Sequence, residues 1–238
     1  MNKNIAIIPA RGGSKRIPRK NIKPFNGIPI LGYSIKAALD SGLFHTVMVS
    51  TDDIEIKHVA ESLGAKVPFF RSAKASDDYA PIMDVLEDVF SAYKERTLMF
   101  DHCCCILATA PLIQIKDIQE AYTQLLSDAS LHAVVPVAPF SYPIQRALKI
   151  ENGIVSMVLP ENINVRSNDL EPRFHDAGQF FWVKASECAG GKSIFSMRCK
   201  PIILGLNQVQ DIDTEEDWVV AEYKYSLMKS NKEFSTSE

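Results

Sequence analysis

The chain has 238 residues, which fits one large domain or one domain with an insertion. Its net charge is -3, from 26 basic and 29 acidic residues, and this argues against a general nucleic-acid-binding protein. No stretch approaches the ~20 apolar residues that span a bilayer, and the N-terminal apolar run is too short for a signal peptide. Five cysteines, an odd number, favour reduced thiols. We therefore expect a cytoplasmic protein that binds neither membranes nor nucleic acid.

Short apolar runs typical of buried strands recur along the chain. They lie at 5–9, 46–50, 66–70, 103–108, 133–137, 180–183 and 201–206. Apolar residues at three- and four-residue spacing between the early runs predict helices at 29–42, 53–64, 79–95 and 115–128. A last helix is expected at 215–227, with Trp218 and Tyr223 packed against the sheet. This alternation predicts a Rossmann-like, three-layer α/β/α domain with a mainly parallel sheet.

The alternation stops after Val137. Residues 138–175 are rich in Pro, Asn and charged residues, and 147–158 read as a hairpin that turns at Asn152-Gly153. We interpret 138–175 as an insertion into a single domain, either a lid or a dimerisation arm. The cysteine run 103–105 does not predict a metal site, because consecutive side chains of a strand point to opposite faces.

A basic loop, defined here as residues 11–23, follows the first predicted strand. It carries six cations within an irregular stretch: Arg11, Lys15, Arg16, Arg19, Lys20 and Lys23. Ligands of open α/β sheets bind at the carboxyl ends of the strands, and Gly12-Gly13 lets the backbone approach an anion closely. The loop is therefore expected to bind a polyphosphate, although neither G-x-x-x-x-G-K-[ST] nor G-x-G-x-x-G is present and a merely solvated basic loop is the alternative.

Near the other end of the chain, Asp211 and Asp213 stand two residues apart, so in an extended chain they share one face. Two such carboxylates suit Mg²⁺. The alternative role for Asp213 is helix capping, because Glu216 follows three residues later.

The motif IPARGGSKRIPRKN at 8–21 resembles the opening signature of the CMP-sialic acid synthetase (acylneuraminate cytidylyltransferase) family. The blocks GIPILGYSIKAALDSGLF, VMVSTDDIEI, AESLGAKVPFFRSAKASDD and DIDTEEDW resemble successive family blocks in the same order. The resemblance spans the chain from Ile5 to about Leu227 and implies a fold of the nucleotide-diphospho-sugar transferase type. It also implies transfer of CMP from CTP to the anomeric hydroxyl of an acidic nine-carbon sugar, with release of pyrophosphate.

The resemblance implies roles for individual residues. Arg11 and Lys15 would contact the triphosphate, Lys20 would hold phosphate near the reacting centre, and Asn21 would meet the nucleotide. Further nucleotide contacts would come from Ala10, Gly12, Gly13, Ser14, Arg71 and Thr109. Asp211 and Asp213 would hold Mg²⁺ beside the phosphates. The family forms dimers in which the inserted arm completes the neighbouring sugar site, so we expect a homodimer. Arg16 and Arg19 have no assigned role, and no residue identifies itself as the general base.

Two variant segments, LATAP at 107–111 and HDAGQFFW at 175–182, resemble the members that act on pseudaminic acid. We expect Asp176 and Gln179 to contact the sugar, although a turn cap and a strand start are the alternatives. Arg166 would reach the sugar carboxylate. The same reaction on sialic or legionaminic acid is an alternative function, and a non-catalytic nucleotide-binding protein or an adaptor for an acidic partner are alternatives of other classes.

Overall fold

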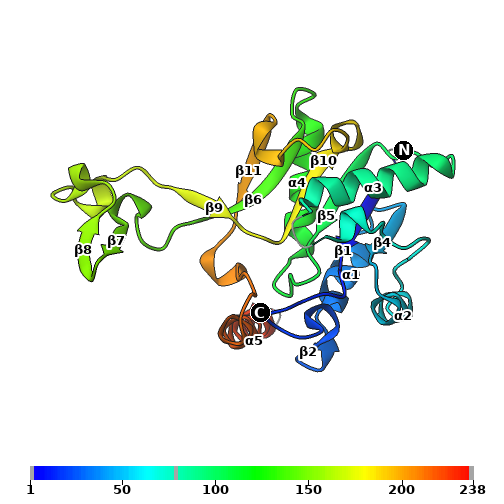
Figure 1. Cartoon of the computed structure of the whole chain (residues 1–238), viewed down its shortest axis with the longest axis horizontal. Helices are drawn as coiled ribbons and strands as arrows, with labels where there is room; N and C mark the ends of the chain where they lie inside the picture. Colours follow the sequence, from blue (N-terminus) through cyan, green and yellow to red (C-terminus); the bar gives the residue numbers. More distant parts are fainter. Residues whose placement is uncertain (1–2, 78–79, 236–238) are drawn as a thin grey trace.

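A computed structural model gives the fold, and it describes residues 3–77 and 80–235, without side chains beyond 230. Its central sheet is seven-stranded, in the order β11-β6-β10-β5-β1-β4, with β9 also paired to β6 (Figure 1). The strands are β1 Asn4–Pro9, β4 Thr46–Ser50, β5 His102–Ile106, β6 Ala133–Pro139, β9 Phe174–Asp176, β10 Phe180–Lys184 and β11 Cys199–Ile203. Strands β4, β1 and β5 pair in parallel, as do β6 and β11, whereas β10 is antiparallel to both β5 and β6.

Helices cover both faces of this sheet, which confirms the predicted layers. They are α1 Leu31–Asp40, α2 Ile54–Ser62, α3 Ile82–Glu95, α4 Ile115–Ser127 and α5 Glu215–Ser235. Apolar residues of α1, α2 and α4 form one core with the sheet, and those of α3 form the core on the opposite face. The cysteine run lies in β5, with Cys104 in the first core and Cys103 and Cys105 in the second, as the alternation of a strand requires.

One predicted strand is wrong. Residues 66–70 form no strand, and only Lys66 makes a bridge, to Met48 beside β4. Pro68 has no N–H to donate to a sheet, which accounts for the early end of the pairing.

A third, smaller core lies below the sheet and joins the two ends of the chain. It is formed by Ile17, Phe25, Ile30, Ile212, Trp218 and Ala221. The short hairpin β2 Pro24–Phe25 and β3 Ile28–Pro29 brings Phe25 against the Trp218 ring, with centroids 5.5 Å apart. The expectation that Trp218 and Tyr223 pack on the sheet is therefore wrong: Trp218 is buried in this third core, and Tyr223 is 67% exposed. We call this cluster the joining core.

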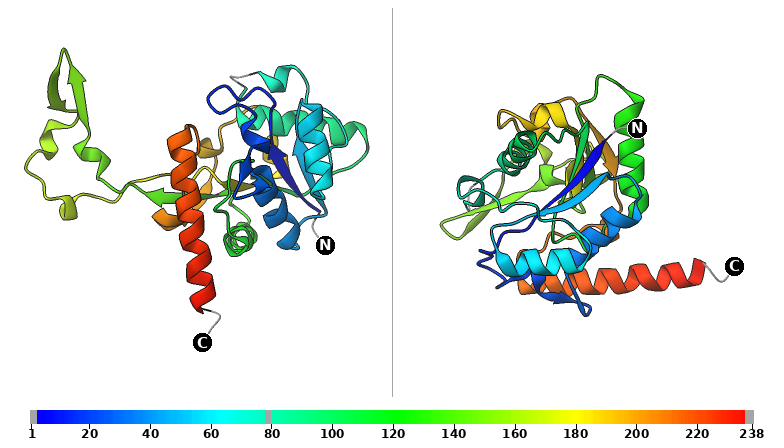
Figure 2. Two further views of the ribbon diagram at one scale, coloured as in Figure 1. Left: turned by 90° about the horizontal axis from the view of Figure 1, so that it is seen from below. Right: turned by 90° about the vertical axis from the view of Figure 1, so that its right-hand side faces the viewer.

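An arm, residues 140–173, projects from the body between β6 and β9 (Figures 1 and 2). Its hairpin consists of β7 Leu148–Glu151 and β8 Ile154–Met157, and the predicted turn at Asn152-Gly153 has positive φ at both residues, 52° and 77°. Many of its apolar side chains are exposed: Tyr142, Ile144, Leu148, Ile150, Ile154, Val155, Val158, Leu159 and Ile163. In the part of the chain that the structure describes, no helix combines the length and apolar character needed to cross a membrane.

Candidate active site

A cavity of about 620 Å³ opens at the carboxyl ends of β1 and β5, where a parallel sheet places its ligands. Its described lining is Pro9, Arg11, Ser14, Lys15, Arg16, Lys20, Asn21, Arg71, Ala75, Asp77, Ala80, Ile82, Val85, Leu107, Ala108, Thr109 and Asp213. Five of these described residues are cations and two are carboxylates, and the rest are mostly small or apolar. The lining therefore offers positive charge for an anion together with small and apolar side chains for an apolar or aromatic group.

Two hydrogen bonds hold the backbone of the basic loop, one to the neighbouring β4–α2 connection and one within the loop. The Gly12 amide donates to Asp52 Oδ1 at 2.9 Å, and Asn21 Nδ2 donates to the Arg11 carbonyl at 2.9 Å. Asn21 is buried and also lines the cavity, so it braces the loop beside the space where a nucleotide contact is expected. These bonds fix the backbone that carries Arg11 without using the cation itself.

Arg19, for which the sequence indicated no role, is a structural residue. Its guanidinium pairs with Asp53, at 2.6 Å to Oδ2 and 3.0 Å to Oδ1, and also with Glu55. Asp53 is the N-cap of α2 and accepts from the Glu55 and Ile56 amides. The hydrogen bond from Arg19 is the main reason why the pKa of Asp53 falls to about 2. Arg19 thus ties the basic loop to the start of α2, away from the cavity.

Gly12 allows the basic loop to lie close against the β4–α2 connection. A Cβ at Gly12 would lie 2.7 Å from Asp53 Oδ2, whereas a Cβ at Gly13 would meet no atom within 4 Å. The two glycines that look equivalent in the sequence therefore differ: Gly12 is required by packing, and Gly13 stands in open space. Ala10 is fully buried, and its amide donates to the Ser50 carbonyl at 2.9 Å.

Arg16, the other unassigned cation, lies on the opposite side of the loop and faces the C-terminal carboxylates. Its Nη1 stands 2.9 Å from Asp213 Oδ2, and Lys20 Nζ stands 3.5 Å from Asp213 Oδ1. Lys20 also donates to the Ile212 carbonyl at 2.6 Å. The structure therefore brings together two motifs that are 192 residues apart in the sequence.

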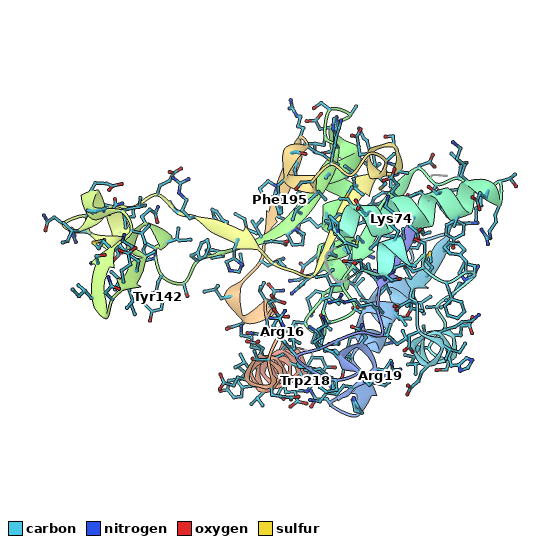
Figure 3. All side chains as sticks on the ribbon, in the orientation of Figure 1. Arg16, Arg19, Lys74, Tyr142, Phe195 and Trp218 are labelled. Atoms are coloured by element: carbon cyan, nitrogen blue, oxygen red, sulfur yellow. The ribbon has the colours of Figure 1, made fainter. Side chains whose placement is uncertain are left out.

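The joining core sets this orientation. Ile17 follows Arg16 and Ile212 precedes Asp213, and both isoleucines are fully buried in the joining core. With the apolar side chain fixed in the core, each polar neighbour is directed to the cavity. Sequence reasoning missed both isoleucines, although a single apolar residue inside each polar motif was the available signal. In Figure 3 the labels of Arg16, Trp218 and Arg19 gather in one region, where the basic loop meets α5.

Asp213 is not the helix cap. Thr214 and Asp217 form the capping pair of α5: the Asp217 amide donates to Thr214 Oγ1 at 3.2 Å, and Asp217 Oδ2 accepts from the Thr214 amide at 2.8 Å. The expected partner, Glu216, is exposed. Capping therefore does not occupy the Asp213 carboxylate.

The Asp211–Asp213 pair has the donor chemistry of a hard-cation site. Loss of water around the carboxylate, and then the like charge of Asp213, raise the pKa of Asp211. Within the described ranges no group of three His, Cys, Asp or Glu gathers as a metal site, so protein ligands alone do not complete one. Mg²⁺ commonly takes one or two carboxylates and completes its shell with water and substrate phosphates, so the pair fits this ion in the presence of a nucleotide.

Arg71 is a buried cation at the floor of the cavity. It is 8% exposed, its Nε donates to Ser50 Oγ at 3.0 Å, and its Nη2 donates to the Ser50 carbonyl. Burial lowers its pKa, while the nearby carboxylates of Asp52 and Asp88 act in the opposite direction. Ser50, the last residue of β4, thus holds Arg71 in place, and both Arg71 and Thr109 line the cavity.

The three predicted sugar contacts do not line this cavity within one protomer. Arg166 lies on the arm, just before the short 3-10 turn Ser167–Asp169. Asp176 is exposed, and its Oδ1 accepts from the Gly178 amide at 2.9 Å in a local turn. Gln179 is 3% exposed, and its Nε2 donates to the Gln208 carbonyl.

Comparison with known proteins agrees with this architecture. A family model described as cytidylyltransferase matches residues 5–163. The chain is 41% identical over 226 residues to a pseudaminic acid cytidylyltransferase of Campylobacter jejuni, covering 94% of this chain and 97% of that protein. It is 30% identical over 232 residues to a CMP-N,N'-diacetyllegionaminic acid synthase of Legionella pneumophila, covering 96% and 97%.

Solved structures show the same fold. A CMP:2-keto-3-deoxy-manno-octonic acid synthetase solved with CTP superposes with a TM-score of 0.69 at 16% identity, covering 96% of this chain and 99% of that one. The predicted α/β class is therefore confirmed, and so is the family resemblance read from the motifs. Because the family model matches residues 5–163 and these relatives align along nearly the whole chain, the protein belongs to the cytidylyltransferase family.

Proposed function

We propose that this protein transfers CMP from CTP to the anomeric hydroxyl of pseudaminic acid. The observation that carries the proposal is the end-to-end similarity to the Campylobacter jejuni enzyme, together with a cavity lined by cations at the carboxyl edge of the sheet. The hydroxyl oxygen would attack the α-phosphorus and lose its proton to solvent, the bond from the α-phosphorus to the bridging β-phosphate oxygen would break, and pyrophosphate would leave with the electron pair of that bond. Phosphoryl transfer depends on positioning and charge neutralisation, which is what a cation-rich cavity supplies.

The cavity lining divides the roles within this reaction. Arg11, Lys15 and Lys20 would neutralise the triphosphate, and Arg16 would join them when it exchanges Asp213 for phosphate. The small and apolar side, including Ala80 and Leu107, would enclose the nucleoside. Asp211 and Asp213 would hold Mg²⁺, which when bound supplies positive charge beside the phosphates.

A panel of sugars tests the substrate assignment. Pyrophosphate release is measured with CTP and purified pseudaminic, legionaminic or sialic acid, and we expect turnover on pseudaminic acid to exceed that on the others. Turnover of sialic acid with none on pseudaminic acid would overturn the assignment. Lys20→Met should abolish most of the pyrophosphate release, because this variant removes a cation at the carboxylate that faces the phosphates. Saturable CTP binding without turnover of any of these sugars would favour a non-catalytic nucleotide-binding protein.

We also propose that the arm makes the protein a homodimer. A two-stranded hairpin is at best marginally stable alone, and the arm exposes apolar side chains such as Ile150 at 73% and Ile154 at 71%. Tyr142 stands far from Arg16 and Trp218 in Figure 3, so the arm extends away from the cavity of its own protomer. Arg166 would then reach the sugar site of the partner protomer.

Mixing two inactive variants tests this arrangement. Lys20→Met and Arg166→Ala protomers, refolded or expressed together, would form mixed dimers in which one cavity has both wild-type residues, so about a quarter of wild-type activity would return. If Arg166 served its own cavity, the mixture would stay inactive. Arg173→Ala is the matched control, since Arg173 is an exposed arm cation paired only locally, with Glu171 among the described residues.

A further inference from the structure

The two metal-site aspartates lie in a segment with little regular structure of its own. Between the end of β11 at Ile203 and the start of α5 at Glu215, the described elements include just one 3-10 turn, Leu206–Gln208. Two carboxylates that share one ion need a fixed separation, and an irregular segment does not supply it without outside contacts. We call residues 204–214 the aspartate segment.

Lys224, on the third turn of α5, makes three hydrogen bonds to this segment. Its Nζ donates to the Val209 carbonyl at 2.6 Å, to the Leu206 carbonyl at 3.2 Å and to Gln210 Oε1 at 3.0 Å. An ammonium has three donors, and all three have acceptors here. Burial lowers the pKa of Lys224, as expected for a cation taken partly out of water. Sequence inspection treats this lysine as one more polar residue of a surface helix.

Other contacts hold the rest of the segment, and near Val209 and Gln210 they add to those of Lys224: Val209 is buried in the first core, and Gln210 Nε2 donates to Asp217 Oδ1 at 3.4 Å. On its C-terminal side, Asp217 accepts from the Asp213 amide at 3.1 Å, and Lys20 donates to the Ile212 carbonyl. On its N-terminal side, Gln208 donates to Asp117 at 3.4 Å and its carbonyl accepts from Gln179. Helix α5 thus holds the backbone directly before Asp211 through Lys224, and Asp217, in the first turn of the same helix, holds the backbone after it.

We propose that Lys224 is a positioning residue that sets the backbone before Asp211 and thereby the geometry of the Asp211–Asp213 metal site. It does not line the cavity and acts through the carbonyls of Leu206 and Val209. The inference rests on the proposed function, because it takes the aspartate pair to hold Mg²⁺. Helix α5 is then a template for the site, anchored by Trp218 in the joining core and contacting the segment through Lys224 and Asp217.

The test measures binding of the metal directly. Mn²⁺, a paramagnetic substitute for Mg²⁺, is titrated into the full-length protein with CTP and without sugar, and the bound fraction is read by electron paramagnetic resonance. Lys224→Met keeps the apolar stem and removes the three donors. We expect roughly tenfold weaker Mn²⁺ binding, in the range found when residues that orient metal ligands are removed. At saturating Mg²⁺ the variant should recover most of its kcat, with the loss confined to the KM for the metal.

Lys229→Met is the matched control, because Lys229 lies on the same helix and its described contact is with the Tyr225 ring. It should bind Mn²⁺ as the wild type does. If Lys224→Met does not fold, Lys224→Gln, which is too short to reach both carbonyls, should show the same weakening. Equal Mn²⁺ affinity in wild type and the Lys224 variant would overturn this inference alone. A wild type that binds CTP but no Mn²⁺ would overturn the metal assignment of the proposed function as well.

Discussion

Gly12→Ala is the sharpest structural test of how the basic loop is held. The new Cβ would lie 2.7 Å from Asp53 Oδ2, the oxygen that also accepts from Arg19. Because this distance is shorter than any normal carbon–oxygen contact, the Asp53 carboxylate must move. It cannot move without weakening both the Arg19 pair and the N-cap of α2.

The magnitude follows from these two contacts. Loss of an N-cap costs about 0.5–2 kcal/mol, and a partly exposed ion pair contributes roughly 0.2–1 kcal/mol. The variant should therefore lose about 1–3 kcal/mol of unfolding free energy, which for a chain of this size is roughly 2–12 °C in Tm. Gly13→Ala is the matched control, because it restricts the unfolded chain to the same extent and meets no atom within 4 Å.

The assay is urea unfolding of both variants, followed by circular dichroism. Gly12→Ala should have the lower midpoint, and the difference between the two variants isolates the clash. In an Asp53→Gly background, which removes the atoms that the new Cβ meets, Gly12→Ala should cost no more than Gly13→Ala. Equal midpoints for Gly12→Ala and Gly13→Ala in the wild-type background would refute the reasoning.

Three further predictions follow from the same structure. The pKa of Asp53 is depressed to about 2, below its unfolded value of about 4, so the stabilisation from Arg19 is present above pH ~4 and is lost as the pH falls through ~2. The difference in unfolding free energy between wild type and Arg19→Met should therefore shrink over that interval. A difference that stays constant from pH 6 to pH 2 would contradict this prediction. Ile17→Ala should lose about 2–4 kcal/mol of unfolding free energy, because it opens a cavity in the joining core, and calorimetry should show weaker CTP binding. Ile144→Ala, on the exposed arm, is the comparison variant. Equal losses of stability in the two variants would exclude the joining core as the cause. Burial raises the pKa of Cys103, Cys104 and Cys105, and it raises that of half-buried Cys199 to about 11. Iodoacetamide at pH 8 should therefore modify the native protein slowly, and at Cys199 first. Rapid modification of the β5 cysteines, detected by mass spectrometry, would contradict their burial.

Much of the sheet was predictable because parallel strands covered on both faces are continuous apolar runs. The runs at 46–50 and 133–137 became β4 and β6 almost residue for residue. The run at 66–70 failed because apolar character alone does not reveal whether a backbone donor is missing, as it is at Pro68. The antiparallel direction of β10 was not predictable either, since it depends on how the chain returns from the arm.

The candidate site was predictable where a residue type matches a chemical need. Basic residues expected to bind phosphate and paired carboxylates expected to bind a cation are residues of this kind, and the structure brings Lys20 and Asp213 together. Residues that act through packing or backbone contacts leave no such mark. In the sequence, Arg19 looks like one of the six cations of the basic loop that would bind phosphate. Its partner Asp53 is 34 residues away in the chain, and only the structure shows that the two are paired. Lys224 likewise shows its contacts only once α5 is placed beside the aspartate segment.

The joining core also has a consequence for how the protein is made. Lys20 and the carbonyl that it contacts are 192 residues apart, so a ribosome that adds 5–20 residues per second needs roughly 10–40 s to produce the second half of the contact after the first. During that interval the nascent chain has Ile17 and Phe25 without their partners from α5. The contacts between the basic loop and Asp213 therefore form only after the chain has been made through α5, so this side of the cavity is completed later than the sheet edge on which it stands.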